Sequence, residues 1–351
     1  MKRFNDIFEK MVSLENLFAA WDAFASDKRK RRDVRWFEWR LEQNIFSLHR
    51  DLQSQRYRHG PYSGFYISDP KPRQIHKATV RDRIVHHAVF TVLESVFEPT
   101  FIPTSFSCRR GKGTHSGVTA LEKSIRQISQ NYHRPCFVLK CDVKKFFASV
   151  GHAILLEMVG RRVGDERAMS LIREIVESYD ASRNSKAGDT SSASHGLPIG
   201  NLTSQLFANI YLNQFDQFVK HQLKIKHYFR YTDDFIIVHR DETYLRNLIP
   251  ALTDFLTMRL KLALHPDKVF LRKCHQGVDF LGYVLLPHHR RLRARTKRRI
   301  LRKLDARVQE LHAGTISSVQ FEQSLQSYLG VLSHADEAEF SRDLKNTLWV
   351  R

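Results

Sequence analysis

The sequence predicts a globular α+β protein that divides into subdomains, and three observations support this fold class. The chain has 351 residues, which is long enough to build a large core and to divide into subdomains. Hydrophobic residues make up 42% and aromatic residues 11%, a composition typical of folded proteins. Both ends of the chain carry helical periodicity, whereas the middle contains short apolar runs of strand character.

The charge balance indicates a polyanionic partner. Lys and Arg number 57 against 37 Asp and Glu, which gives a net charge of +20. Nucleic acid is the commonest partner of such a protein, and an anionic membrane surface is the alternative. No apolar run approaches the length of a membrane span, and the N-terminus lacks a signal-peptide pattern. We therefore expect a cytoplasmic protein with no membrane partner. The cysteines show no Cys-x-x-Cys spacing, which favours reduced thiols over a zinc site or disulfides.

The N-terminal part, residues 5–55, has apolar side chains at helical spacing, such as Leu17 and Trp21. A basic run at residues 28–32 interrupts these helices. It is most simply a solvated loop, although in a protein this basic it can also contact phosphates. The other expected elements are, in chain order, short strands and turns at 61–116, helices at 117–130 and 154–179, a loop at 182–195, a helix after residue 200, a helix at 245–260, and C-terminal helices after the arginine-dense stretch 290–302.

Residues 227–239 predict a tight β-hairpin with a polar tip. Two aromatic and β-branched runs flank Thr232, Asp233 and Asp234, and such runs are typical of buried strands. An isolated Asp-Asp pair is usually an ordinary turn. On a buried hairpin, however, two adjacent carboxylates repel each other and need a partner. A hard divalent cation held by oxygen ligands is the partner we expect.

A third carboxylate, Asp142, ends an apolar run and is followed by Lys-Lys-Phe-Phe, a turn into a helix. A strand-end aspartate can project into a site built on a sheet. Together with Asp233 and Asp234, it would complete the set needed to hold two Mg²⁺ ions for an in-line phosphoryl transfer. One ion would activate the attacking 3′-hydroxyl, and both would stabilise the developing charge.

Three segments resemble motifs of reverse transcriptases. Residues 231–234 resemble the Tyr-x-Asp-Asp box, and residues 137–147 resemble the first palm motif. Residues 196–210 resemble the motif between them, but they contain Ile199-Gly200 and Ser204-Gln205 where most of these enzymes have Gln-Gly and Ser-Pro. This variant is similar to the one in diversity-generating retroelements of the group II intron-like, bacterial and phage lineage. The resemblance runs from about residue 56 to the C-terminus, in the expected order.

The resemblance implies the right-hand polymerase fold, with a ferredoxin-like palm, helical and hairpin fingers, and a helical thumb. The implied regions are an N-terminal helical region at 1–60, fingers at 61–116 and 152–196, palm at 117–151 and 197–286, and a basic helical thumb at 287–351.

It also implies site residues. The implied catalytic residues are Asp142, Asp233, Asp234 and Lys268, and the implied metal ligands are the three aspartates and the Val143 carbonyl. The implied dNTP-binding residues are Lys71, Arg73, Phe147, Ile199 and Gly200. The implied template and primer contacts are Arg83, Arg109, Arg110, Lys112, Ser204, Gln205, Leu281 and Gly282. For Lys71 and Arg73, an exposed basic hairpin without a ligand has equal weight.

Three positions carry specific expectations from the resemblance. Phe147 occupies the sugar-gate position, where a ring would exclude a ribose 2′-hydroxyl; its alternative role is core packing. Ile199 cannot make the hydrogen bond of the usual glutamine, so we expect low fidelity, and the family implies mutagenesis at template adenines. Lys268 resembles the lysine proposed to protonate the leaving pyrophosphate.

The expected activity is RNA-templated DNA synthesis with two Mg²⁺ ions, or Mn²⁺ in their place, for mutagenic retrohoming in a diversity-generating retroelement. The implied partners are dNTPs, a structured template or non-coding RNA, the RNA–DNA hybrid and a small basic accessory protein of the accessory variability determinant type. One alternative is a stand-alone antiphage-defence or retron-like reverse transcriptase that uses its own non-coding RNA. Another is a catalytically inactive polymerase fold that scaffolds RNA, which three intact carboxylates disfavour.

Overall fold

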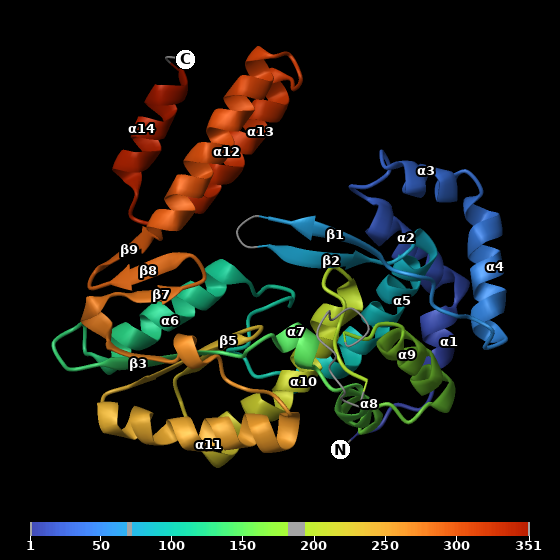
Figure 1. Cartoon of the computed structure of the whole chain (residues 1–351), viewed down its shortest axis with the longest axis horizontal. Helices are drawn as coiled ribbons and strands as arrows, with labels where there is room; N and C mark the ends of the chain where they lie inside the picture. Colours follow the sequence, from blue (N-terminus) through green and yellow to red (C-terminus); the bar gives the residue numbers. More distant parts are fainter. Residues whose placement is uncertain (1, 69–71, 182–193, 350–351) are drawn as a thin grey trace. The chain divides into compact units, whose positions relative to one another are not determined.

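The computed structural model describes residues 2–68, 72–181 and 194–349 (Figure 1). The chain forms two compact units. Unit 1 comprises Met1–Pro103, Asp142–Ile225 and Pro250–Pro266, and unit 2 comprises Thr104–Cys141, Lys226–Ile249 and Asp267–Arg351. Helices and antiparallel strands both contribute, which confirms the α+β class, whereas the division into fingers, palm and thumb stays a prediction. No described helix is both long enough and apolar enough to span a membrane.

Unit 1 is mainly helical, and helix α5 (Val80–Phe97) lies at its centre, in contact with α2 (Leu14–Ala25) and α10 (Leu202–Gln217). The Thr79 hydroxyl caps α5 by accepting a hydrogen bond from the Asp82 backbone N–H at 3.2 Å. Side chains such as Ile84 and Val89 are fully buried. The other helices of unit 1 are α1 (Phe8–Val12), α2 (Leu14–Ala25), α3 (Arg32–Glu38), α4 (Leu41–Gln53), η1 (Glu98–Thr100), α7 (Phe146–Ser149), α8 (His152–Gly160), α9 (Glu166–Glu177), α10 (Leu202–Gln217) and η3 (Phe218–Gln222). They confirm the helices expected at 5–55, at 154–179 and after residue 200.

Strands β1 (Ser63–Ile67) and β2 (Arg73–Lys77) form an antiparallel hairpin in unit 1, with Ile67 opposite Arg73. Every side chain of β1 is exposed, whereas His76 on β2 is buried. The hairpin therefore rests on the unit through β2, and β1 faces solvent.

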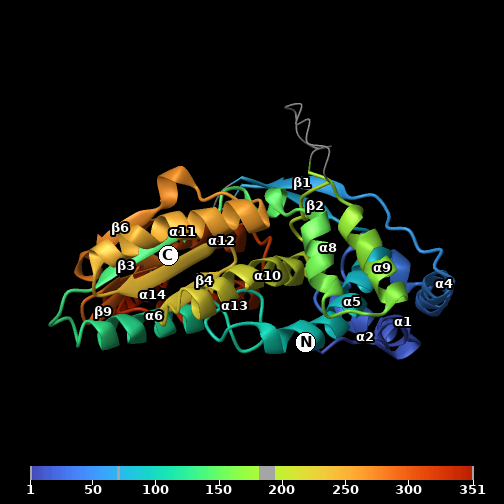
Figure 2. The ribbon, with the colours of Figure 1, turned by 90° about the horizontal axis from the view of Figure 1, so that it is seen from below.

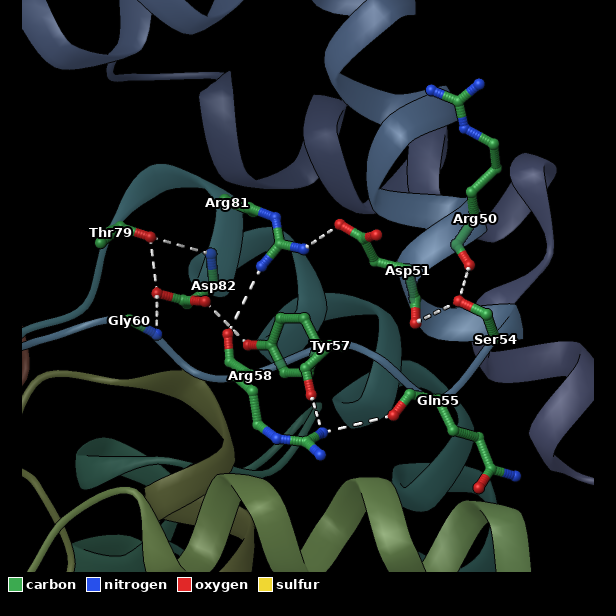
Figure 3. Close-up of polar contacts among 10 residues, drawn as sticks. All are labelled: Arg50, Asp51, Ser54, Gln55, Tyr57, Arg58, Gly60, Thr79, Arg81 and Asp82. Atoms are coloured by element: carbon green, nitrogen blue, oxygen red, sulfur yellow. Dashed lines mark hydrogen bonds and ion pairs between the residues drawn. The ribbon is translucent and has the colours of Figure 1, made fainter.

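The base of this hairpin is fixed by the buried carboxylate of Asp82 (Figure 3). Its Oδ1 atom accepts a hydrogen bond from the Tyr57 hydroxyl at 2.8 Å. Its Oδ2 atom accepts hydrogen bonds from the Thr79 hydroxyl at 2.6 Å and from the Gly60 backbone N–H at 3.1 Å. Burial, followed by the charge of Asp82, raises the pKa of Tyr57 well above its ordinary value, so this hydroxyl remains a hydrogen-bond donor.

Unit 2 contains a four-stranded sheet in the order β4-β5-β3-β6. Its strands are β3 (Phe137–Asp142), β4 (Tyr228–Tyr231), β5 (Asp234–His239) and β6 (Phe270–Lys273). Helix α6 (Thr114–Ile128) lies along one face of the sheet (Figure 2). Its Leu121 and Ile125 side chains form one buried core with Val138 of β3 and Ile236 of β5. The helix expected at 117–130 is therefore confirmed.

A second sheet, in the order β7-β8-β9, contains β7 (Val278–Phe280), β8 (Tyr283–Leu286) and β9 (His289–Leu292). It leads into α12 (Ala294–His312), α13 (Ser318–Leu332) and α14 (Ala338–Trp349), of which α12 and α13 lie side by side (Figure 1). The arginine-dense stretch 290–302 therefore begins in an edge strand and becomes helical only at Ala294. The short helices η4 (Pro266–Lys268) and η5 (Cys274–Gln276) flank β6, and helix α11 (Glu242–Leu260) contributes residues to both units.

Polar contacts attach the C-terminal helices to the rest of unit 2. The buried carboxylate of Glu337 accepts hydrogen bonds from the Leu292 backbone N–H at 3.1 Å and from Lys297 Nζ at 2.6 Å. Arg290 forms an ion pair with Glu122 on α6. These contacts join the second sheet, α6 and the C-terminal helices into one body.

Candidate active site

The hairpin predicted at residues 227–239 is confirmed. Strands β4 and β5 pair with Tyr231 opposite Asp234, so Thr232 and Asp233 form a two-residue tip. Thr232 has φ +53°, a left-handed conformation that is unusual for a β-branched residue. Its hydroxyl donates a hydrogen bond to the Ser107 hydroxyl at 2.7 Å, which holds the tip in place. Backbone strain of this kind is concentrated at functional sites.

A buried arginine lies directly behind the tip. Arg230 on β4 is only 1% exposed, and its guanidinium donates a hydrogen bond to the Thr232 carbonyl at 3.1 Å. Its backbone N–H and carbonyl bond to Thr104 and Phe106 at 3.0 and 2.9 Å. A positive charge bonded to the backbone of the tip can offset part of the repulsion between two adjacent carboxylates. Sequence analysis missed this role, although a single arginine within an apolar strand run is a usable indication.

Lys140 supplies a second positive charge. Its Nζ atom lies 3.4 Å from Oδ2 of Asp234 and donates a hydrogen bond to the Asp279 carbonyl at 3.0 Å. Burial, followed by the charge of Asp234, raises the pKa of the adjacent Cys141 thiol to about 12, so this thiol stays protonated at neutral pH. Lys140 was also missed, although it stands two residues before Asp142 and therefore on the same face of β3.

The chain that follows β3 pairs with residues 263–265 in unit 1. The Asp142 carbonyl accepts a hydrogen bond from the His265 N–H, and the Lys144 N–H donates to the Ala263 carbonyl, both at 2.8 Å. Val143 and Leu264 therefore stand opposite each other between two hydrogen-bonded positions. In such an antiparallel pair the backbone groups of Val143 point away from Leu264. The Val143 carbonyl therefore makes no hydrogen bond to residues 263–265, and a metal ligand would require such an orientation.

The predicted carboxylates lie on neighbouring strands. Asp142 is the last residue of β3, Asp234 is the first residue of β5, and β3 is next to β5 in the sheet. All three aspartates are half-buried. Within residues 2–68, 72–181 and 194–349, no three His, Cys, Asp or Glu side chains are grouped closely enough to hold a metal ion. A shared metal site therefore stays a prediction, although carboxylate and carbonyl oxygens are the ligands that Mg²⁺ prefers.

In unit 1, Phe147 is linked directly to the segment 196–200. Phe147 is half-buried, with its ring edge-on to Phe146 at a centroid distance of 5.4 Å. Its carbonyl accepts a hydrogen bond from the Leu197 N–H at 2.7 Å. Gly200 has φ +117°, and a Cβ atom there would lie 2.8 Å from Cγ2 of Ile75 on β2. Only glycine fits this position without strain.

Strand β2 is also bonded to the same segment. The His76 N–H donates to the Ile199 carbonyl at 3.0 Å, and the Asn201 side-chain amide donates to the His76 carbonyl at 2.9 Å. The His76 ring is buried edge-on against Tyr179, with no hydrogen-bond partner for either nitrogen among the described residues. Burial lowers the pKa of His76, so the ring is neutral. Neither His76 nor Asn201 was found from the sequence.

The other residues of unit 1 that were expected to bind dNTP or template differ in exposure. Arg73 is exposed on β2, whereas Lys71 lies outside the described residues. Arg83 is largely buried: its guanidinium lies 3.0 Å from the Asp33 carboxylate and 4.5 Å from the centre of the Phe24 ring. This packing favours a structural role for Arg83 over the expected template contact.

Ser204 and Gln205 on α10 also differ in exposure. Ser204 is 2% exposed and Gln205 is exposed, so only the glutamine side chain is accessible to a template or primer. The expected contact through the Ser204 side chain is therefore disfavoured by its burial.

In unit 2, the basic loop before α6 is anchored by its own arginine. Arg109 donates a hydrogen bond to the Ser105 carbonyl at 2.8 Å, and Lys112 Nζ lies 5.6 Å from the centre of the Phe106 ring. Arg110 is exposed. The loop thus presents cations on a fixed backbone, as a phosphate contact requires.

Leu281 and Gly282, which are expected primer contacts, form the turn between the antiparallel strands β7 and β8. Both residues have positive φ, +51° and +92°, and the Gly282 carbonyl accepts a hydrogen bond from the Arg293 N–H at 3.0 Å. Lys268, the expected proton donor, lies half-buried at the end of η4.

Known proteins resemble this chain over much of its length. Residues 68–285 match the family model described as reverse transcriptase (RNA-dependent DNA polymerase). The chain is 26% identical over 281 residues to Protein YkfC of Escherichia coli (strain K12), covering 70% of this chain and 72% of that protein. It is 27% identical over 188 residues to the group II intron-encoded protein LtrA of Lactococcus lactis subsp. cremoris, covering 53% of this chain and 29% of LtrA. A solved structure of telomerase from Candida albicans, with a fragment of telomeric RNA, aligns with a TM-score of 0.48 and 10% identity over 67% of this chain and 46% of that one.

Proposed function

This chain belongs to the reverse transcriptase family of RNA-directed DNA polymerases, and from that premise we propose that it copies a structured template RNA into DNA by two-metal phosphoryl transfer. The observation that carries the proposal is the β4–β5 hairpin, whose strained tip presents Asp233 next to Asp234. Strand β3, which ends at Asp142, is the neighbour of β5 in the sheet. The ligands of this site would be dNTPs and an RNA–DNA hybrid.

The family generally uses divalent metal ions, and the residues here fit Mg²⁺. Asp142 and Asp233 would be the main ligands, with Asp234 and the Val143 carbonyl completing the set. When bound, the ions supply the positive charge that activates a 3′-hydroxyl and stabilises the phosphoryl group in transfer. Arg230 and Lys140 would limit the repulsion within the carboxylate set before the ions enter.

The residues proposed to contact the nucleotide belong to unit 1. Arg73 would contact the triphosphate, since a guanidinium suits phosphate oxygens. The Phe147 ring would stand against the sugar, and Ile199 and Gly200 would lie near the nascent base pair. The hydrogen bonds that join Phe147 to Leu197, and His76 to Ile199, support this arrangement because they tie the sugar and base positions to one segment.

A primer-extension assay on a homopolymer RNA template tests the polymerase. We expect Mg²⁺-dependent synthesis that falls about a thousandfold or more in Asp233→Asn, because metal-ligand contacts are worth several kcal/mol in the transition state. Asp305→Asn, an exposed aspartate of α12, is the matched control and should retain full activity. Extension by Asp233→Asn at the wild-type rate would refute the assignment. The assay is run with and without co-purifying RNA and proteins, so that a missing partner is not mistaken for an inactive site.

We further propose that the polymerase is error-prone and serves mutagenic retrohoming in a diversity-generating retroelement, with a small basic accessory protein. The support is Ile199, whose side chain is apolar and half-buried and would offer no hydrogen bond to a nascent base pair. Replacement by Gln should lower the error rate, most clearly at template adenines, whereas Ile199→Leu should not. An unchanged error rate in Ile199→Gln, measured by sequencing the cDNA, would contradict the proposal.

A further inference from the structure

The corner between α3 and α4 in unit 1 carries two unusually exposed tryptophans. Trp36 is 84% exposed and Trp39 is 87% exposed. They are three residues apart, at the end of α3 and at its C-cap, so both indoles lie on the same side of this turn. An indole is among the largest apolar groups in proteins and is rarely left in water without a partner.

These indoles are not needed to hold α3 in place. The opposite face of α3 is already packed, because Val34 is fully buried and Phe37 stacks on Trp21 of α2 at a centroid distance of 5.4 Å. The Phe37 carbonyl also accepts a hydrogen bond from the Asn44 side chain at 2.9 Å, which closes the corner toward α4. The outward tryptophans therefore add nothing to the packing of this corner.

Cations surround the two indoles. An open hollow at this corner is lined by Trp36 and Trp39 with Lys30, Arg32, Arg35 and Arg40. No carboxylate is among the described residues that line it, and none of the four cations forms an ion pair with a described residue.

The acidic residues nearest in sequence are already engaged. Asp33 is paired with Lys77 at 2.6 Å and with Arg83 at 3.0 Å, and Glu38 is paired with Arg29. The hollow therefore keeps its positive charge, and its ligand must bring the negative charge.

We propose that this corner, the Trp36/Trp39 surface, binds a single-stranded segment of RNA. Unpaired bases can stack on the two indoles while the backbone phosphates meet the surrounding guanidinium and ammonium groups. A double helix offers phosphates to the cations, but its bases are stacked inside and cannot stack on the indoles. The choice of RNA over DNA rests on the proposed function, in which RNA is the template. The surface lies on elements that carry none of the catalytic carboxylates.

Photo-cross-linking locates the bound nucleic acid directly. The full-length chain, blocked by Asp233→Asn, is irradiated with a 4-thiouridine-containing oligo(rU) of about 12 nucleotides, and the adducts are mapped by mass spectrometry. We expect adducts at Trp36 and Trp39. Labelling should be weaker when the photoreactive thio base is carried by duplex RNA or by oligo(dT) of the same length. Adducts confined to other parts of the chain would overturn the proposal, as would stronger labelling by duplex or DNA.

Affinity measurements separate stacking from charge. Each Trp→Ala change should weaken oligo(rU) binding at this surface about tenfold, without altering the salt dependence. Arg35→Gln with Arg40→Gln should instead reduce the slope of log affinity against log salt by about 1.4, or 0.7 for each lost phosphate contact. Trp36→Phe with Trp39→Phe should retain most of the affinity because it keeps two aromatic faces.

Met258→Ala is the matched control, since Met258 is an apolar side chain that is 72% exposed on α11. It should bind RNA like the wild type. Trp36→Ala with Trp39→Ala should also keep the wild-type unfolding midpoint and full primer extension on a short template. Unchanged RNA affinity in this double variant, or a change in its oligomeric state instead, would overturn the RNA surface while leaving the polymerase assignment intact.

Discussion

Lys140 and Asp234 form an ion pair across neighbouring strands, with Nζ 3.4 Å from Oδ2. A lysine in this position opposes an incoming cation, because it already neutralises part of the charge that would attract the metal. Lys140→Met should therefore lower the Mg²⁺ concentration for half-maximal primer extension, by roughly threefold, since one unit charge is removed a few ångströms from the proposed ligands. Lys273→Met, an exposed lysine on β6, should leave the Mg²⁺ dependence unchanged. A higher Mg²⁺ requirement in Lys140→Met would show that the lysine supports the site instead.

Phe147 should control the choice of sugar. In Phe147→Ala the space occupied by the half-buried ring becomes available to a 2′-hydroxyl, so the preference for dNTP over rNTP should fall by about a hundredfold. The measurement is kcat/KM for a matched dNTP and rNTP. Phe147→Tyr keeps the ring and should keep the preference. An unchanged preference in the alanine variant would assign the ring to packing against Phe146 alone.

Gly200 should not tolerate a side chain. At φ +117° an alanine is strained, and its Cβ would meet Ile75 at 2.8 Å, so β2 must move away. We expect Gly200→Ala to reduce stability by about 1–3 kcal/mol and to raise KM for the dNTP. Adding Ile75→Ala should relieve the contact but not the backbone strain, and so should restore KM only in part. Wild-type stability and KM in Gly200→Ala would contradict this view of the segment.

His86 should make unit 1 sensitive to acid. Its buried ring contacts the Thr203 hydroxyl at 2.6 Å and His59 at 3.1 Å, and burial lowers the pKa of His86 to about 3. Because the unfolded chain takes up a proton near pH 6.5 and the folded ring does not, stability is present above that pH and is lost as the pH falls toward 3. The expected loss between pH 6.5 and pH 5 is about 2 kcal/mol.

His86→Gln should flatten this pH dependence, even where it lowers stability at neutral pH. His275→Gln, at an exposed position, should leave the pH dependence as in the wild type. Chemical unfolding at several pH values gives the comparison, and identical slopes for wild type and His86→Gln would exclude His86 as the source.

The sequence was sufficient to predict elements that depend on a local pattern. The hairpin around Asp233 follows from two apolar runs and a polar tip, and the strand before Asp142 follows from one run and its end. The partners of these residues could not be found in this way. Lys140 meets Asp234 from a strand that lies far away in the sequence, and His76 meets Ile199 from another. Such contacts depend on strand order, which no local pattern fixes.

The sequence also could not predict which side chains of a helix are exposed. Trp36 and Trp39 lie within residues 5–55, where the sequence predicts helices, and apolar residues in a helix are normally assigned to its buried face. The structure instead buries Val34 and leaves Trp36 and Trp39 in water, because α2 covers only one side of α3. Which face of a short helix is covered is decided by its neighbours.

The bonds from His76 to Ile199 and from Asn201 to His76 have a consequence for the timing of nucleotide selection. If a triphosphate binds Arg73 as proposed, any displacement of β2 would be transmitted to residue 199 through these hydrogen bonds. Binding of the triphosphate and selection of the base pair would then occur in one step. A mismatched nucleotide would not be bound through its phosphates before its base pair is tested.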